Sequence, residues 1–146
     1  MAGSVGVAVR SAVIDGLADA LTSDGEVSYG FTFQPGLLEQ VYTGRSSGTT
    51  PPAAMRSGRN YRDEQGTFDL NILVRVPGGS LLEADERADE IATVVEEWIA
   101  DRKSNQLGVT GLNYLLVTRW DADYVQVDAG MCSIRSLTVS WRARLT

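Results

Sequence analysis

The chain has 146 residues, 43% of them hydrophobic, with a net charge of −6, an isoelectric point near 4.6 and no histidine. This length suits one domain with its own core, and the acidic balance argues against a general nucleic-acid-binding protein, because such proteins neutralise phosphates with a basic excess. The lack of histidine excludes Ser–His and Cys–His nucleophilic catalysis, and the single Cys132 excludes an internal disulfide and is expected to be a small buried hydrophobe.

No apolar segment resembles the core of a signal peptide, and none approaches the roughly 20 apolar residues that a membrane-spanning helix needs. We therefore expect a protein that is made in the cytosol and does not associate with a membrane.

One helix and two strands are predicted before the middle of the chain. From Ser4 to Leu21 the apolar residues recur at four-residue spacing, which predicts an amphipathic helix with one buried face: Val9, Val13, Leu17 and Leu21. Residues Val27 to Phe33 alternate as a strand does, and Pro35 and Gly36 follow it. Leu38 to Gly44 predicts a second, short strand.

The segment from Gly44 to Asn60 is rich in glycine, proline and small polar residues, and Met55 is its one large apolar residue. Long loops within compact domains are usually functional or disordered, so we predict a flexible contact arm. Although the chain as a whole is acidic, four basic residues lie in or beside this segment: Arg45, Arg56, Arg59 and Arg62. We expect them to contact a neighbouring subunit or a partner, and the alternative is that they only keep a hairpin tip soluble.

A strand and a helix follow the loop. Residues Thr67 to Val76 alternate between apolar and mostly polar side chains, with Leu73 as the exception, which predicts a strand with one buried face. Ser80 and Glu83 have the spacing of a capping box, which predicts a helix from Ser80 to Lys103. Its apolar stripe is predicted to face the core: Ala84, Ala88, Ile91, Ala92, Val95, Trp98 and Ile99.

The opposite face of this helix is acidic. Repulsion between like charges at helical spacing costs a few tenths of a kcal/mol per pair, which leaves room for a basic partner. The candidate contacts on this face are Glu86, Asp89, Glu90 and Glu97. The alternative is an ordinary solvated face.

The last third of the chain is predicted to form closing strands. Leu112 to Trp120 and Tyr124 to Val127 read as paired strands separated by Asp121 to Asp123. Ser136 to Leu145 alternates again, and a strand at this position is usually held by pairing on both sides or by a neighbouring subunit.

Three acids in this region are the best metal candidates. Asp121, Asp123 and Asp128 lie close together in the sequence, and hard cations such as Mg²⁺ and Ca²⁺ take carboxylate oxygens. Their spacing matches no defined calcium loop, and aspartate is common in turns for its own backbone hydrogen bonds. We therefore expect no metal, no cofactor and no catalytic residue.

The order of the elements resembles the tail terminator (tail completion) proteins of long-tailed bacteriophages. The likeness rests on a leading helix, the strand Val27 to Phe33, Val41-Tyr42-Thr43-Gly44 before a long loop, Arg62-Asp63-Glu64 before an alternating strand, then the acidic helix and closing strands. It extends over nearly the whole chain, and the order of the parts carries it, because no single motif is distinctive.

The resemblance implies a single α+β domain over residues 1–146, with an antiparallel or mixed sheet covered on one side by two main helices. It also implies a ring, typically a hexamer, that caps the tail tube, ends its polymerisation and docks to the head–tail connector protein. DNA would pass through the lumen without specific binding. The protein would be assembled in the host cytoplasm and lie at the head-proximal end of the tail in the virion.

Two other functions stay open. Another neck or minor tail protein would share the small α+β design and bind on the portal side. A metal-dependent hydrolase that uses Asp121, Asp123 and Asp128 comes from a different class and has less support.

Overall fold

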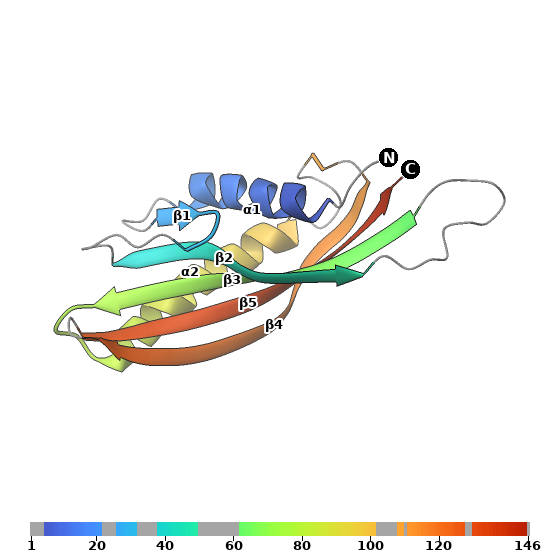
Figure 1. The fold of residues 1–146 in the computed structure, drawn as a ribbon. Helices are drawn as coiled ribbons and strands as arrows, with labels where there is room; N and C mark the ends of the chain where they lie inside the picture. Colours follow the sequence, from blue (N-terminus) through green and yellow to red (C-terminus); the bar gives the residue numbers. More distant parts are fainter. Residues whose placement is uncertain are drawn as a thin grey trace.

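A computed structural model describes residues 5–21, 26–31, 38–49, 62–101, 108–109, 111–127 and 130–145. Within them a five-stranded mixed sheet, in the order β1-β2-β3-β5-β4, packs against two helices, which confirms the expected α+β fold (Figure 1). The elements are α1 (Gly6–Ala20), β1 (Glu26–Ser28), β2 (Glu39–Thr49), β3 (Arg62–Val76), α2 (Leu81–Asp101), β4 (Leu112–Val127) and β5 (Gly130–Leu145).

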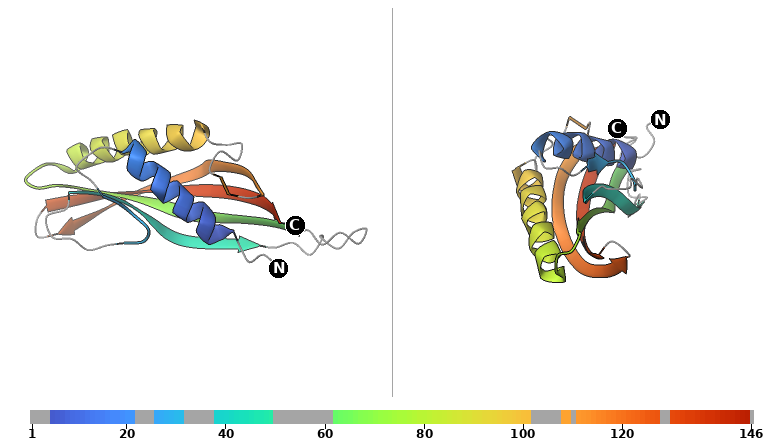
Figure 2. Two further views of the ribbon diagram at one scale, coloured as in Figure 1. Left: turned by 90° about the horizontal axis from the view of Figure 1, so that it is seen from above. Right: turned by 90° about the vertical axis from the view of Figure 1, so that its left-hand side faces the viewer.

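The core lies on one face of the sheet. The alternation of β3 is as predicted, because Phe68, Leu70, Ile72 and Val74 are buried while Asp69 and Asn71 on the other face are partly exposed. Buried residues of both helices belong to the same apolar cluster, so α1 and α2 share this face of the sheet (Figure 2). The opposite face, called the open face below, carries no helix among the described residues.

Helix α2 buries the whole of its predicted stripe, from Ala84 to Ile99. Its start is capped as expected, since the Glu83 N–H donates to Ser80 Oγ at 3.2 Å. Trp98 is almost fully buried and lies against Gly16 of α1, where a side chain would collide with the indole ring. The two helices therefore meet where one contributes a large ring and the other no side chain.

Helix α1 follows the predicted spacing, with Val9, Val13 and Leu17 fully buried. The residue at its N-terminal cap is bonded to a group that is distant in the sequence, because the N–H of Val5 donates to Glu64 Oε1 at 2.9 Å. A carboxylate at this position satisfies a free N–H of the helix and suits the positive end of the helix dipole. Glu64 itself is buried.

Strand β5 lies inside the sheet and pairs with β3 on one side and β4 on the other. Its pairing with β3 runs without interruption from Arg62↔Leu145 to Val76↔Met131. The C-terminal strand is therefore held within the subunit, which was one of the two expected arrangements.

The boundaries around the predicted arm need correction. The second strand was expected to end at Gly44, but β2 continues to Thr49, and β3 begins at Arg62. Residues Ser46 to Thr49 pair with Phe68 to Gln65, so backbone hydrogen bonds extend the hairpin although its side chains are small and polar. Residues 50–61, with Arg56 and Arg59, lie outside the described residues.

The strand predicted over Val27 to Phe33 is also shorter than expected. It covers only Glu26–Ser28 and pairs in parallel with β2. Gly30 has φ +84°, a conformation that favours glycine and takes the backbone out of the extended form. Phe33 lies outside the described residues.

The break expected at Asp121 to Asp123 is absent, since β4 is continuous from Leu112 to Val127. Its pairing with β5 runs through these aspartates, with bulges between Leu112 and Tyr114 and between Val117 and Arg119. Polar residues fit here because Asp121 and Asp123 are exposed to solvent. The long ladder outweighs the low strand propensity of aspartate.

Candidate assembly surfaces

The net negative charge of the protein is concentrated on α2. The helix carries eight acidic residues and one arginine, an excess of acid larger than the net charge of −6 of the whole chain. All four candidate contacts on it are exposed to solvent: Glu86, Asp89, Glu90 and Glu97. The sheet and α1 together are thus close to neutral, and the acidic character belongs to one side of the molecule.

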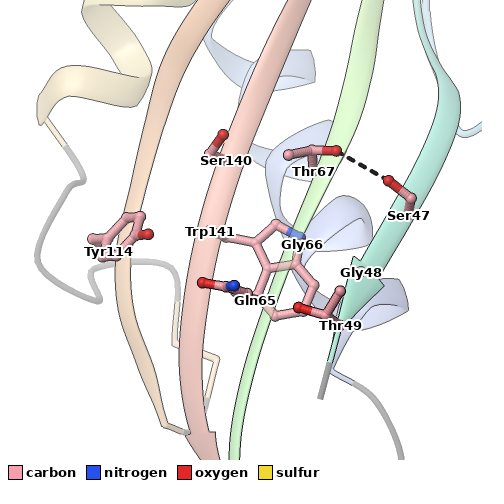
Figure 3. Close-up of a pocket in the computed structure, with 9 residues that line it drawn as sticks. All are labelled: Ser47, Gly48, Thr49, Gln65, Gly66, Thr67, Tyr114, Ser140 and Trp141. Atoms are coloured by element: carbon pink, nitrogen blue, oxygen red, sulfur yellow. Dashed lines mark hydrogen bonds between the residues drawn. The ribbon is translucent and has the colours of Figure 1, made fainter. Parts of the chain in front are cut away.

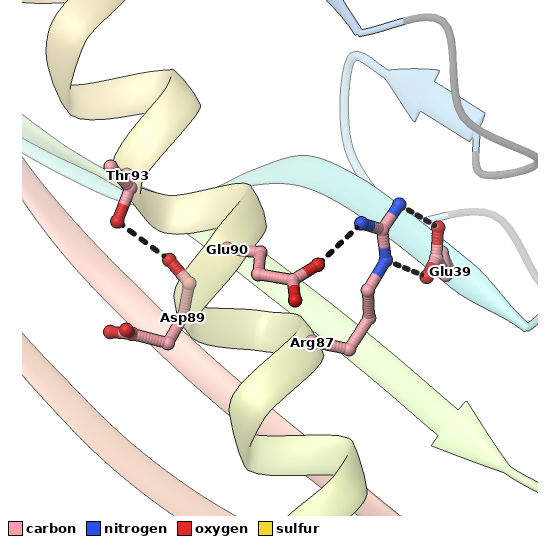
Figure 4. A network of polar contacts seen from close by, with 5 residues as sticks. All are labelled: Glu39, Arg87, Asp89, Glu90 and Thr93. Carbon is pink, nitrogen blue, oxygen red and sulfur yellow. Dashed lines mark hydrogen bonds and ion pairs between the residues drawn. The ribbon is translucent and has the colours of Figure 1, made fainter.

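Two of these four candidates already interact within the subunit. Asp89 accepts a hydrogen bond from Arg135 of β5 at 2.7 Å. Glu90 accepts one from Arg87 at 3.0 Å, as Figure 4 shows. Glu86 and Glu97 are therefore the better candidates for contacts with another molecule.

Arg87 ties α2 to β2. Its Nε lies 2.5 Å from Glu39 Oε2 and its second guanidinium nitrogen lies 3.0 Å from Oε1, which makes a two-pronged ion pair (Figure 4). The hydrogen bonds that Arg87 donates to Glu39 raise the pKa of Arg87 above its usual value. Because a planar guanidinium matches a carboxylate in this way, the pair fixes how the helix sits on the sheet.

The structure places two of the four candidate arginines. Arg45 is exposed in β2, within the irregularity between Thr43 and Ser46, and Arg62 is the first residue of β3. Arg56 and Arg59 lie outside the described residues. The grouping of all four is therefore still a prediction.

A basic cluster that the sequence pattern did not reveal lies at the same end of the sheet. Arg144 Nε donates to Asp63 Oδ1 at 2.9 Å, and Arg142 donates to Asp63 Oδ2 at 3.1 Å. These hydrogen bonds lower the pKa of Asp63 below its ordinary value. The alternation of the last strand placed both arginines on its polar face, but their acidic partner follows only from the register between β3 and β5.

The open face of the sheet is polar and largely bonded to itself. Thr138 donates to Asp69 at 3.3 Å, Ser136 donates to Asn71 at 2.6 Å, and the hydroxyls of Thr118 and Ser140 are 2.9 Å apart. These cross-strand contacts stabilise the sheet on the face where no described helix lies. The face is therefore suited to solvent or to another molecule.

A shallow hollow of about 370 Å³ lies where β2, β3, β5 and β4 run side by side (Figure 3). The ring of Trp141 lies against Gly66, which leaves no room for a side chain there. The lining has no carboxylate, amine or thiol, so it offers no group that exchanges protons near neutral pH. The lining residues are Ser47, Gly48, Thr49, Gln65, Gly66, Thr67, Tyr114, Ser140 and Trp141.

The acids proposed as metal ligands have local partners. Asp121 accepts from Arg119 at 3.1 Å, and Asp123 Oδ1 accepts the N–H of Tyr124 at 2.8 Å. Asp128 lies outside the described residues. Within the part of the chain that the structure describes, no three Cys, Asp or Glu residues gather as a metal site would require.

The cysteine and the helices can be compared with the expectations from composition. Cys132 is a free cysteine and is buried, as expected. Neither described helix is long and apolar enough to cross a membrane.

Taken together, the described elements define an α+β domain with an acidic helix layer on one face of the sheet and, on the other, a polar face that no described element covers. No family model matches the sequence, and no curated protein sequence matches it. Among solved structures, the fold is similar to that of a chain in the virion of a native gene transfer agent particle, with a TM-score of 0.62 and 17% sequence identity. The similarity covers 96% of this chain and 99% of the other. At this identity the two chains share a fold, and that fold occurs in a virion.

Proposed function

We propose that this protein is a structural component of a phage-like virion and acts as its tail terminator. In this role a ring of copies, a hexamer as the family resemblance implies, caps the tail tube, ends its polymerisation and joins the tail to the head–tail connector protein. The observation that carries the proposal is the structural similarity to a chain of a virion, which extends over nearly the full length of both chains. The order of elements seen in the sequence supports the same role.

The distribution of charge is consistent with assembly in a ring. A ring built head to tail uses two different surfaces on every subunit. The exposed acids Glu86 and Glu97 supply one surface, and the arginines around the loop supply the other, beginning with Arg45. An acidic subunit would also keep DNA from binding as it passes through the lumen, because the charges are alike.

The first experiment measures assembly. Native mass spectrometry and negative-stain imaging of the purified protein, alone and with tail tubes, should show closed rings or rings at one tube end. A protein that remains a single subunit and does not bind tube ends would refute the proposal. Binding to the connector without binding to the tube would instead favour the alternative, another neck or minor tail protein.

A second experiment tests the loop arginines. Changing Arg56 and Arg59 to Glu should weaken ring assembly or tube binding at least tenfold while thermal unfolding stays unchanged, because the charge of the contact is reversed. Changing both residues to Lys is the matched control, since it keeps the charge. If the Glu variant forms rings and caps tubes as the wild type does, the arginines have no part in assembly.

A metal-dependent hydrolase can be tested separately. Calorimetric titration with Mg²⁺ or Ca²⁺ would have to show micromolar binding that Asp123→Asn abolishes.

A further inference from the structure

The two lateral edges of the sheet expose large apolar side chains, and this feature is independent of the loop. Strand β4 forms one edge, and β1 with the free part of β2 forms the other. Four of the exposed apolar residues lie along β4, namely Leu116, Trp120, Tyr124 and Val125, and two aromatic residues, Tyr29 and Phe31, directly follow β1. The two patches lie at opposite ends of the strand order.

The β4 edge combines a groove with a strand that pairs on only one side among the described residues. Beside this edge, α2 and β4 enclose a hollow of about 410 Å³ that includes Glu96, Ile99 and Trp120. The indole of Trp120 is 59% exposed and lies 5.1 Å from the guanidinium of Arg135. A strand of 16 residues with a free edge is a template for pairing with another chain.

The acids near this edge outnumber the bases. Asp121 and Asp123 of β4 and Glu96 of α2 are exposed, and Arg119 is already paired with Asp121. The β4 edge is thus both apolar and acidic, and it is suited to a partner that is aromatic and basic.

The opposite edge, formed by β1 and β2, is both aromatic and basic. Phe31 is 59% exposed and meets Tyr42 edge to face, with the ring centroids 5.3 Å apart. Arg10 of α1 lies 5.7 Å from the centre of the Tyr29 ring and donates to its hydroxyl at 3.0 Å. Arg45 lies exposed farther along β2.

This second edge also has backbone available for pairing. Strand β1 pairs with only Gln40 to Tyr42 of β2, so among the described strands none lies beside β2 from Thr43 to Thr49 on that side. Arg10 reaches this part of β2, because it also donates to Ser46 Oγ. An extended partner strand would find backbone groups that no described strand pairs with, flanked by arginine and aromatic side chains.

We propose that the β4 edge of one subunit docks against the β1–β2 edge of a second copy. Trp120 and the neighbouring acids would meet Phe31, Tyr29 and the arginines. The contact would bury apolar side chains against each other and pair acidic with basic ones. Because the two surfaces differ, the contact is head to tail and repeats around a ring. This inference rests on the ring of the proposed function and names the surfaces that close it.

Two substitutions, one at each edge, test the inference. Trp120→Asp should disable the β4 edge and Phe31→Asp the opposite edge, so each variant alone should have the mass of a single subunit. An equimolar mixture should form a dimer and nothing larger, because one intact edge of each kind remains. Light scattering coupled to gel filtration measures these masses, and if the wild type assembles only on tubes, the same variants are compared by tube binding and imaging.

Leu82→Asp is the matched control. Leu82 is 66% exposed in the first turn of α2 and does not line the groove, and an added acid suits that end of the helix. This variant should assemble as the wild type does, and all three variants should keep the wild-type circular dichroism spectrum and unfolding temperature within a few degrees.

The possible outcomes separate the two proposals. Rings that survive both edge substitutions would overturn the edge contact and leave the proposed function in place. A mixture that remains at single-subunit mass, or one edge variant that still dimerises alone, would rule out the head-to-tail pairing of these two edges. A wild type that neither assembles nor binds tubes would contradict the proposed function itself.

Discussion

At the scale of single residues, a few carboxylates connect parts of the chain that are far apart in sequence. Glu39 accepts hydrogen bonds from Arg87 of α2, and Asp63 accepts them from two arginines of β5. Glu64 accepts the N–H of Val5, the residue just before α1. Glu64 is buried, whereas Glu39 and Asp63 are partly exposed, and the degree of exposure decides how much each charge contributes to stability.

Asp63 should make stability depend on pH at the acid end. Its pKa in the folded protein is lowered from 3.8 by the hydrogen bonds from Arg144 and Arg142. The stabilisation is therefore fully present above about pH 4 and is lost as pH falls through the lowered folded value. Urea unfolding from pH 7 to pH 2 should show that Asp63→Asn is less stable than the wild type at pH 7 and that the difference shrinks below pH 4.

Asp121→Asn provides the comparison. The pair of Asp121 with Arg119 joins two well-exposed side chains, so its loss should change stability less than the loss of Asp63 does. An Asp63→Asn variant whose deficit is the same at pH 7 and pH 2 would show that the ionised carboxylate is not the stabilising form.

At the scale of elements, the contact between α1 and α2 depends on a glycine. The outer faces of both helices could vary widely, but the close approach of Gly16 to the ring of Trp98 leaves no space for a methyl group. The sheet beneath is held by continuous ladders on both sides of β5. The packing of the helices is thus the more sensitive part of the fold.

Gly16→Ala should destabilise the protein although alanine is the better helix former. The gain in helix propensity is about 1 kcal/mol, while forcing a methyl group into a packed contact costs about 1–3 kcal/mol. We expect a net loss of up to about 2 kcal/mol in the free energy of unfolding, measured by urea denaturation.

A second substitution identifies the cause. In a Trp98→Leu background the ring is absent, so Gly16→Ala should become neutral or stabilising. An equal loss in both backgrounds would mean that the collision with Trp98 is not the reason.

At the scale of the whole molecule, charge is separated between layers. The acids concentrate on α2, whereas β5 contributes Arg135, Arg142 and Arg144 and has no acid of its own. This separation gives the protein sides of different character, as a subunit in a closed assembly requires. It also decides how the protein behaves towards nucleic acid.

The acidic side of α2 should prevent DNA binding. The wild type should not retard duplex DNA in a gel at low salt, whereas changing Glu86, Glu96 and Glu97 to Lys brings the net charge from −6 to about zero and should produce retardation that salt abolishes. Changing the same three residues to Gln is the control, because it removes the negative charges without adding positive ones. Retardation by the wild type would contradict a lumen through which DNA passes freely.

The periodicity of the sequence by itself determined which faces are buried. Val9, Val13 and Leu17 in α1, the stripe of α2 and the alternation of β3 were all predicted correctly, because local spacing decides which side chains share a face. The acidic face of α2 was predicted for the same reason. The extent of the strands was not: backbone pairing with neighbouring strands extended β2, β3, β4 and β5 beyond their predicted bounds, and the positive φ of Gly30 ended β1 early.

Only the tertiary structure decided which distant groups meet. The register of β3 with β5 brings Asp63 to Arg142 and Arg144, and the strand order places Trp120 and Phe31 at opposite edges. These relations depend on pairing between segments far apart in the chain, for which local patterns carry no signal. The sequence therefore determined which side chains face the core, while the register and order of the strands decided which surfaces remain for assembly.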